Sequence, residues 1–151
     1  MPQGQNDNQG MITWFVIHAA ATWCLVGLIW MIQVVHYPLL KDVGHENFVA
    51  YHERHMMLVT WVVGPLMLAE AGSAGILIFL GERSLLFGIS LVPLALVWAS
   101  TVFLQIPLHQ RLTLGSDAAT IDRLVATNGW RTLGWTVRGL CLAILLVLRL
   151  H

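Results

Sequence analysis

Residues 56–80, MMLVTWVVGPLMLAEAGSAGILIFL, form an apolar run in which Glu70 is the one charged side chain. A helix of about 20 apolar residues is long enough to cross a lipid bilayer. The next residues, 81–84 (GERS), are polar, and a second apolar run, residues 85–106, follows at once. Because the connection is so short, we predict that these two spans are antiparallel neighbours.

Two more apolar runs complete the pattern, so the predicted spans cover residues 11–36, 56–80, 85–106 and 130–150. Of the 151 residues, 57% are hydrophobic and 11% are charged, whereas an average soluble domain has roughly 25% charged residues. Four spans leave no room for a separate soluble domain. The sequence therefore predicts an all-α protein, a membrane four-helix up-down bundle over residues 11–151, preceded by a polar N-terminal tail at residues 1–10.

Most of the charged side chains lie in the two longer connections, residues 37–55 and 107–129. In an up-down bundle both connections lie on one membrane face, which we call the loop face, and the termini lie on the other. Arg83 and Arg149 belong to the opposite face. The basic residues at the loop face are Lys41, Arg54, Arg111, Arg123 and Arg131. The positive-inside rule then predicts that the loop face is cytoplasmic and the termini are outside.

The charge balance limits the expected partners. Eight basic and eight acidic residues give a formal net charge of zero, so the chain offers no basic field for a nucleic acid. The lipid bilayer is the expected partner, with a small lipophilic molecule as a further candidate. The number of copies in the assembly stays open, a homo-oligomer included.

Polar side chains recur at helical spacing within the spans. His18 and His36 are about five turns apart, and so are His52 and Glu70. Charged and imidazole groups at bilayer depth normally face the interior of a bundle. The sequence therefore predicts an interior polar seam. Its members near the loop face are Gln33, His36, His52, His55, Gln105, His109 and Arg131.

Two charged residues, Glu70 and Arg138, lie deeper in the predicted spans. A buried charge without a partner is much more costly than a paired one, so we expect the two side chains to meet, or to share a ligand, in the middle of the bundle. Glu70 and Arg138 are the predicted catalytic pair, Glu70 exchanging protons and Arg138, or Arg131 in its place, orienting an oxygen or carboxylate of a substrate. A purely structural ion pair is the alternative.

The histidines of the seam are the candidate metal ligands, because neutral imidazole is the commonest protein ligand for zinc, copper, iron and haem. The predicted ligands are His36, His52, His55 and His109, holding a copper, iron or zinc ion or haem b. The predicted cofactor-binding residues around them are Gln33, Gln105, Arg131 and Trp135. Histidines near a membrane interface also form ordinary hydrogen bonds to lipid head groups or carbonyls, and that alternative stays open. His45 and His151 are left out of the set.

Five motifs carry a resemblance to known proteins: QVVHYP (33–38), FVAYHERH (48–55), GPLMLAE (64–70), QIPLH (105–109) and NGWRTLGWTVR (128–138). With these motifs the chain resembles a family of small bacterial four-span membrane proteins of unassigned function, which implies the same fold and the bacterial inner membrane. His18, Trp23 and His36 give a fainter likeness to the four-helix haem-binding protoporphyrinogen oxidases.

Three hypotheses about function follow from this pattern. The first is an integral membrane redox protein that holds a metal ion or haem near one membrane face and acts on a small, flat lipophilic substrate such as a quinone, porphyrin or polycyclic aromatic. The second is a non-catalytic membrane carrier or binding module for a metal, proton or small amphiphile. The third is a structural subunit of a membrane complex. Whether the chain is an enzyme stays open at this point.

Overall fold

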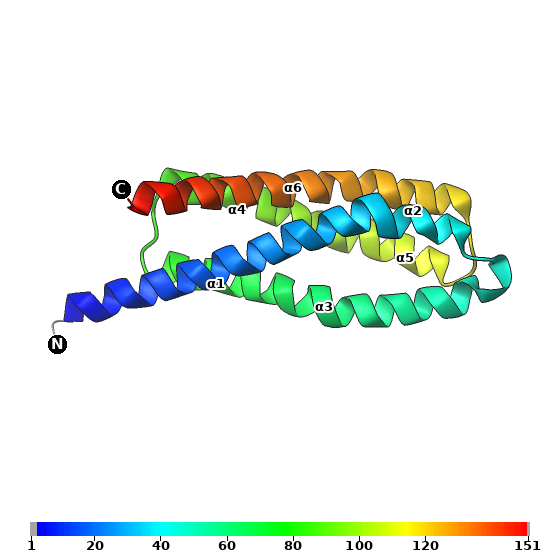
Figure 1. Ribbon diagram of the computed structural model, residues 1–151, viewed down its shortest axis with the longest axis horizontal. Coiled ribbons are helices and arrows are strands. Elements are labelled where there is room, and N and C mark those ends of the chain that lie inside the picture. The colour runs from blue at the N-terminus through cyan, green and yellow to red at the C-terminus, as the bar shows by residue number, and fades with distance from the viewer. Residues whose placement is uncertain (1–2, 151) are drawn as a thin grey trace.

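The computed structural model describes residues 3–150, and this part of the chain is helical apart from short turns (Figure 1). The elements in chain order are α1 (Gln3–Met31), the π-helix η1 (Ile32–His36), α2 (Tyr37–Leu39), the 3₁₀-helix η2 (Leu40–Asp42), α3 (His45–Phe79), α4 (Leu85–Ser100), the π-helix η3 (Thr101–Gln105), α5 (Ile106–Leu112) and α6 (Ala118–Leu150).

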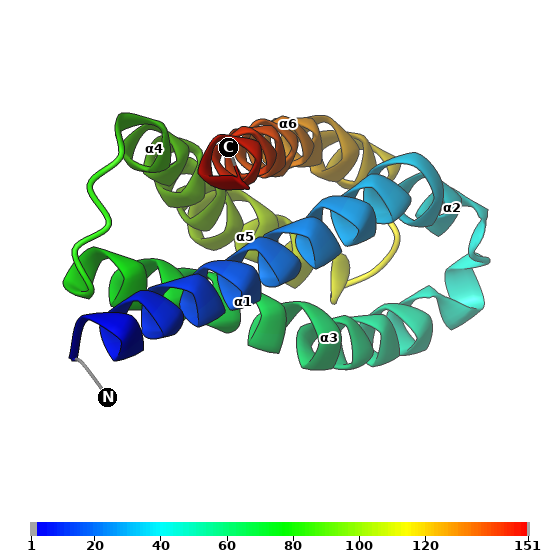
Figure 2. The ribbon, with the colours of Figure 1, turned by 60° about the vertical axis from the view of Figure 1, so that its left-hand side comes forward.

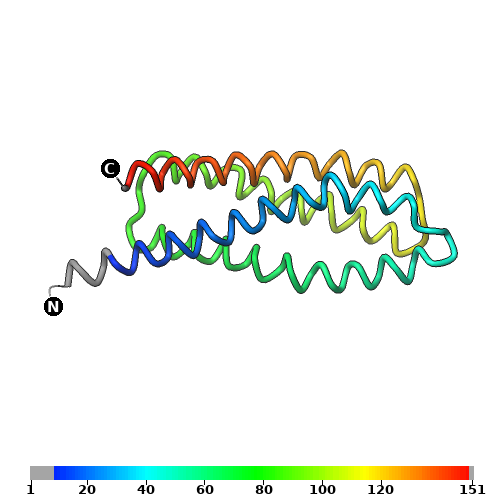
Figure 3. The backbone as a smooth tube through the Cα atoms, in the orientation of Figure 1, coloured from blue at the N-terminus to red at the C-terminus, as the bar shows by residue number. Residues whose placement is uncertain are grey.

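These elements combine into four rods that are long and apolar enough to cross a membrane: Gln9–Asp42, His45–Phe79, Leu85–Leu112 and Ala118–Arg149. The rods run alternately up and down, with both loop-face connections at one end of the bundle (Figures 1 and 3). The predicted all-α, four-helix architecture is confirmed, and the chain is accordingly described as an integral membrane protein.

Close packing joins the rods in the order α4 on α6, α6 on α1 and α1 on α3. The chain crosses from α3 to α4 through the turn at 80–84 (Figure 2), where Gly81 has a φ of 93°. The predicted antiparallel direction of these two helices is confirmed. Among the described elements, however, α3 and α4 are not one of the closely packed pairs, because a cavity lies between them.

At the loop face the helices continue beyond the predicted membrane spans, which leaves short turns at 43–44 and 113–117. Phe48, Leu112, Ile121 and Leu124 are fully buried there and form one core cluster. This apolar contact keeps the last turns of the helices ordered beyond the predicted spans. At the other end, α1 begins at Gln3, so the described part of the polar segment 1–10 is helical; residues 1, 2 and 151 lie outside the described part.

Each π-helical segment precedes a proline. η1 comes before Pro38 and η3 comes before Pro107. Proline cannot donate a hydrogen bond to the carbonyl four residues earlier, and its ring crowds that carbonyl. A π-turn relieves this conflict by admitting one extra residue, which rotates all later side chains by about 100° around the helix. The two π-segments therefore reset the register just before Tyr37 and His109.

Candidate functional site

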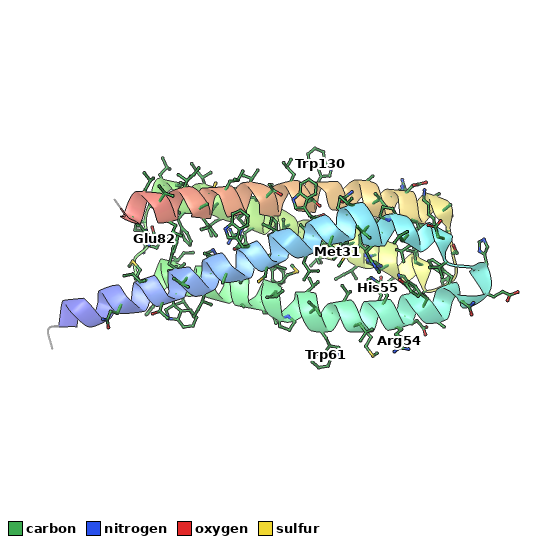
Figure 4. All side chains as sticks on the ribbon, in the orientation of Figure 1. Met31, Arg54, His55, Trp61, Glu82 and Trp130 are labelled. Carbon is green, nitrogen blue, oxygen red and sulfur yellow. The ribbon has the colours of Figure 1, made fainter. Side chains whose placement is uncertain are left out.

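Four imidazole rings gather beneath the loop face, and we call His36, His52, His55 and His109 the histidine cluster. The ring centroids of His36 and His55 are 4.2 Å apart, those of His52 and His109 are 5.3 Å apart, and those of His55 and His109 are 6.1 Å apart. In Figure 4, His55 points from α3 toward the other rods, while Arg54 and Trp61 point away from the bundle. The convergence predicted from helical spacing is present in the structure.

A chain of hydrogen bonds runs through half of the cluster. The Tyr37 hydroxyl lies 2.9 Å from His109 Nε2, and His109 Nδ1 lies 3.0 Å from His52 Nε2. Arg131 lies beside the Tyr37 hydroxyl and has only donors. The phenol therefore donates to His109, His109 Nδ1–H donates to His52, and His52 carries its proton on Nδ1. Tyr37 is not among the residues that helical spacing predicts for the site, although it directly follows His36 in the QVVHYP motif.

Three nitrogens of the cluster are buried without a hydrogen-bond partner among the described residues: His36 Nε2, His52 Nδ1 and His55 Nε2. Buried polar atoms are nearly always hydrogen-bonded, and leaving one unpaired costs about 1–3 kcal/mol. Three such atoms in one cluster indicate a place for an ion, a water molecule or a ligand.

The four rings do not point at one common centre. Within the part of the chain that the structure describes, no three His, Cys, Asp or Glu side chains are arranged to hold a metal ion. The reason is the direct hydrogen bond between His52 and His109, which occupies three of their four ring nitrogens together with Tyr37. In this arrangement, the lone pairs available to an ion are those of His36 and His55.

An apolar cavity of about 310 Å³ adjoins the cluster, and all four rods contribute to its wall. Tyr37 and His109 line it on the side of the cluster. Leu68 of α3 and Val102 of η3 also line it, although their side chains are 66% and 46% exposed on the outside of the bundle. The cavity therefore reaches the outer, lipid-facing surface between α3 and the α4–η3–α5 rod.

Three of the four predicted cofactor-binding residues line this cavity: Gln105, Arg131 and Trp135. Gln33 does not. Its amide nitrogen donates to the Val125 carbonyl at 3.2 Å, and its amide oxygen accepts from Asn128 at 2.8 Å. Gln33 thus ties the first rod to α6, an orientation that helical spacing within one span does not reveal.

A second polar centre lies deeper in the bundle, and Glu70 and Arg138 meet in it as predicted. Arg138 Nε donates to Glu70 Oε1 at 2.8 Å, and both side chains have no exposed surface. Thr22 donates to the same oxygen at 2.8 Å, and the Trp135 indole donates to Glu70 Oε2 at 3.0 Å. Both carboxylate oxygens are therefore occupied.

The same arginine also binds the first and third rods. Arg138 reaches the Ser90 carbonyl at 2.6 Å and His18 Nε2 at 2.8 Å. Because arginine only donates, His18 accepts at Nε2 and carries its proton on Nδ1, which lies 2.8 Å from the Ser73 hydroxyl. All four rods are joined here by charge-assisted hydrogen bonds. Neither Glu70 nor Arg138 lines the cavity; Trp135 contacts both regions.

Comparison with family models, curated proteins and solved structures finds no significant match. The function is therefore argued from the chemistry of the site.

Proposed function

We propose that this membrane protein is a redox protein that holds a metal ion in the histidine cluster and acts on a small lipophilic molecule in the adjoining cavity. One observation carries the proposal: the histidine cluster holds three buried, unpartnered imidazole nitrogens, and its member His109 lines an apolar cavity that reaches the lipid-facing surface. Cavities of roughly 300–1,000 Å³ are typical of small-molecule sites, and imidazole is the ligand shared by redox-active copper and iron.

His36 and His55 would bind the ion through their Nε2 atoms. A third imidazole from His52 or His109 joins them only if the hydrogen bond between those two rings opens. Met56 follows His55 in the sequence and lines the cavity; its soft sulfur favours copper among the candidate ions.

The ring contacts argue against a haem held between His36 and His55 or between His52 and His109. A haem with two axial histidines lies between their rings, whereas the imidazoles here contact one another directly. His36 stacks on His55 with a centroid distance of 4.2 Å, and His52 is hydrogen-bonded to His109 at 3.0 Å. These contacts leave no space between the partners for a macrocycle.

A bound copper or iron ion would supply one-electron chemistry, and the chain's own residues supply a route for protons. Tyr37 and His109 stand on the cavity wall, and His109 is bonded to His52. Neutral imidazole takes up a proton on one nitrogen and releases the proton on the other. A proton from a molecule in the cavity can thus move through Tyr37 and His109 to His52.

The central polar network is better suited to holding the helices together than to carrying ions. The Glu70 carboxylate is already hydrogen-bonded to Thr22, Trp135 and Arg138 and lies off the cavity wall. This observation favours the redox hypothesis over a carrier that uses Glu70.

The proposal is tested by measuring the metal content of the chain, purified in nanodiscs with native lipids, by mass spectrometry alongside an optical spectrum. We expect copper or iron in stoichiometric amount, and loss of the metal in the double variant His36→Ala/His55→Ala. His45→Ala is the matched control, because His45 is exposed at the start of α3. A wild-type chain with neither metal nor a Soret band, or a double variant that keeps its metal, contradicts the proposal.

A further inference from the structure

Three residues that line the cavity each hold one buried polar atom without a hydrogen-bond partner among the described residues: Trp98 Nε1, Gln105 Oε1 and Arg131 Nε. Two are donors and one is an acceptor. They differ from the unpartnered imidazole nitrogens because their residues line the cavity, whereas His36, His52 and His55 do not. Each is a donor or acceptor that only a bound molecule can satisfy, because the described residues offer it no partner.

Other contacts hold two of these side chains in place. Gln105, which is 2% exposed, donates through Nε2 to the Thr127 hydroxyl at 2.9 Å. Arg131, which is 6% exposed, donates to Asn128 at 2.9 Å, and its guanidinium lies 5.2 Å from the centre of the Trp135 ring. Neither side chain can turn away to water without breaking these contacts. The unpartnered atoms of Gln105 and Arg131 are therefore held on side chains fixed at the cavity wall.

The positive charge of Arg131 restricts which molecule the cavity can bind favourably. Among the described residues, its guanidinium forms no salt bridge; the ion pairs are Lys41 with Asp122, Glu70 with Arg138 and Glu82 with Arg149. A buried cation without a counter-charge is costly. An oxygen with a strong negative partial charge, such as a carbonyl or phenol oxygen, lowers that cost.

The rest of the wall is apolar and includes the aromatic rings of Trp98 and Trp135. Aromatic walls suit a flat ring, and a volume of about 310 Å³ fits a small ring system better than a macrocycle. The lipid-side opening beside Leu68 and Val102 gives an apolar tail a way into the bilayer.

We propose that the cavity binds a lipid-soluble quinol or quinone, with its oxygens toward Trp98, Gln105 and Arg131 and its tail between α3 and the α4–η3–α5 rod. The hydroxyl of a quinol donates to Gln105 Oε1, and its oxygens accept from Arg131 and Trp98. A pure hydrocarbon satisfies none of these atoms. The inference names the substrate class for the proposed redox function and rests on it for the chemistry, but the binding itself needs no metal.

The test is equilibrium binding of a radiolabelled decyl benzoquinol to the full chain in nanodiscs, with decylbenzene as a probe of the tail alone. We expect saturable binding of the quinol at one site per chain and no saturable binding of decylbenzene. Gln105→Leu removes the acceptor and weakens binding by about tenfold, the value of one hydrogen bond.

A matched pair of variants tests the location. Val63→Trp fills the cavity, whereas Val62→Trp places the same ring on the lipid-facing side of α3, where Val62 is 51% exposed. We expect the first to abolish quinol binding and the second to leave it unchanged, with both chains eluting as folded protein. Equal binding by both variants, or saturable binding of decylbenzene, overturns the inference.

Metal content measured on the same samples separates the two proposals. Quinol binding without metal contradicts the proposed redox function and supports this site. Metal without quinol binding contradicts this site alone.

Discussion

Nε2 of His52 lies 3.0 Å from Nδ1 of His109, although the two residues belong to different rods of the bundle. This contact divides the histidine cluster into two halves that differ in their contacts. His52 and His109 form a hydrogen-bonded chain with Tyr37, whereas His36 and His55 stack on each other and keep their Nε2 atoms free. In the proposed function, the first half passes protons and the second binds the ion.

The direction of proton donation along the hydrogen bonds from Tyr37 through His109 to His52 is itself testable. Tyr37→Phe removes the donor to His109 Nε2, so His109 is no longer held in the Nδ1–H tautomer. Side-chain ¹⁵N NMR of the wild type is expected to show His109 with its proton on Nδ1, and the variant to show a mixture of tautomers. Tyr51→Phe is the control, because Tyr51 is exposed. A wild-type His109 protonated on Nε2 contradicts the assigned direction.

The ion pair of Glu70 and Arg138 is expected to be the most sensitive point for stability. Arg138→Met leaves the fully buried Glu70 carboxylate without its cation and is expected to destabilise the chain by about 3–5 kcal/mol. The double variant Glu70→Leu/Arg138→Met removes both charges and should recover much of this loss. Thermal unfolding in nanodiscs measures both. A double variant that is no more stable than Arg138→Met contradicts the assigned ion pair.

Close packing of α6 on α4 depends on a glycine. A Cβ added at Gly134 would lie 2.8 Å from Val97 Cγ2, whereas one added at Gly129 meets nothing within 4 Å. Gly134→Ala is expected to cost about 1–3 kcal/mol through overpacking, and Gly129→Ala to be neutral or stabilising because alanine favours helices. Equal unfolding temperatures for the two variants would show that the helices are not in contact here.

Low pH should destabilise the N-terminal turn of α6. The Thr120 hydroxyl and the backbone N–H groups of Thr120 and Ala119 donate to the Asp117 carboxylate and hold its pKa below the ordinary value. A lowered carboxyl pKa stabilises the fold above the ordinary value of about 4 and loses that effect as the pH falls through the folded pKa. Asp117→Asn keeps a capping side chain but cannot titrate. Its unfolding temperature should therefore fall less steeply than that of the wild type below about pH 4; parallel curves contradict this.

The sequence predicts those features that follow from helical periodicity and from the cost of polar groups in a bilayer. The four rods, the meeting of Glu70 with Arg138 and the convergence of the histidines are of this kind. The orientation of Gln33 toward Asn128 and the cavity between α3 and α4 are not, because they depend on how whole helices pack. Tyr37 was missed for a related reason, since the π-turn before it changes the helical register.

X-ray absorption at the edge of the bound metal tests the central claim most directly, because it identifies the ligands of the ion. We predict at least two imidazole nitrogens at about 2.0 Å from the metal, and their loss in His36→Ala/His55→Ala but not in His45→Ala. A shell of water or carboxylate oxygens alone, or a spectrum unchanged by the double variant, would contradict a metal centre in the histidine cluster.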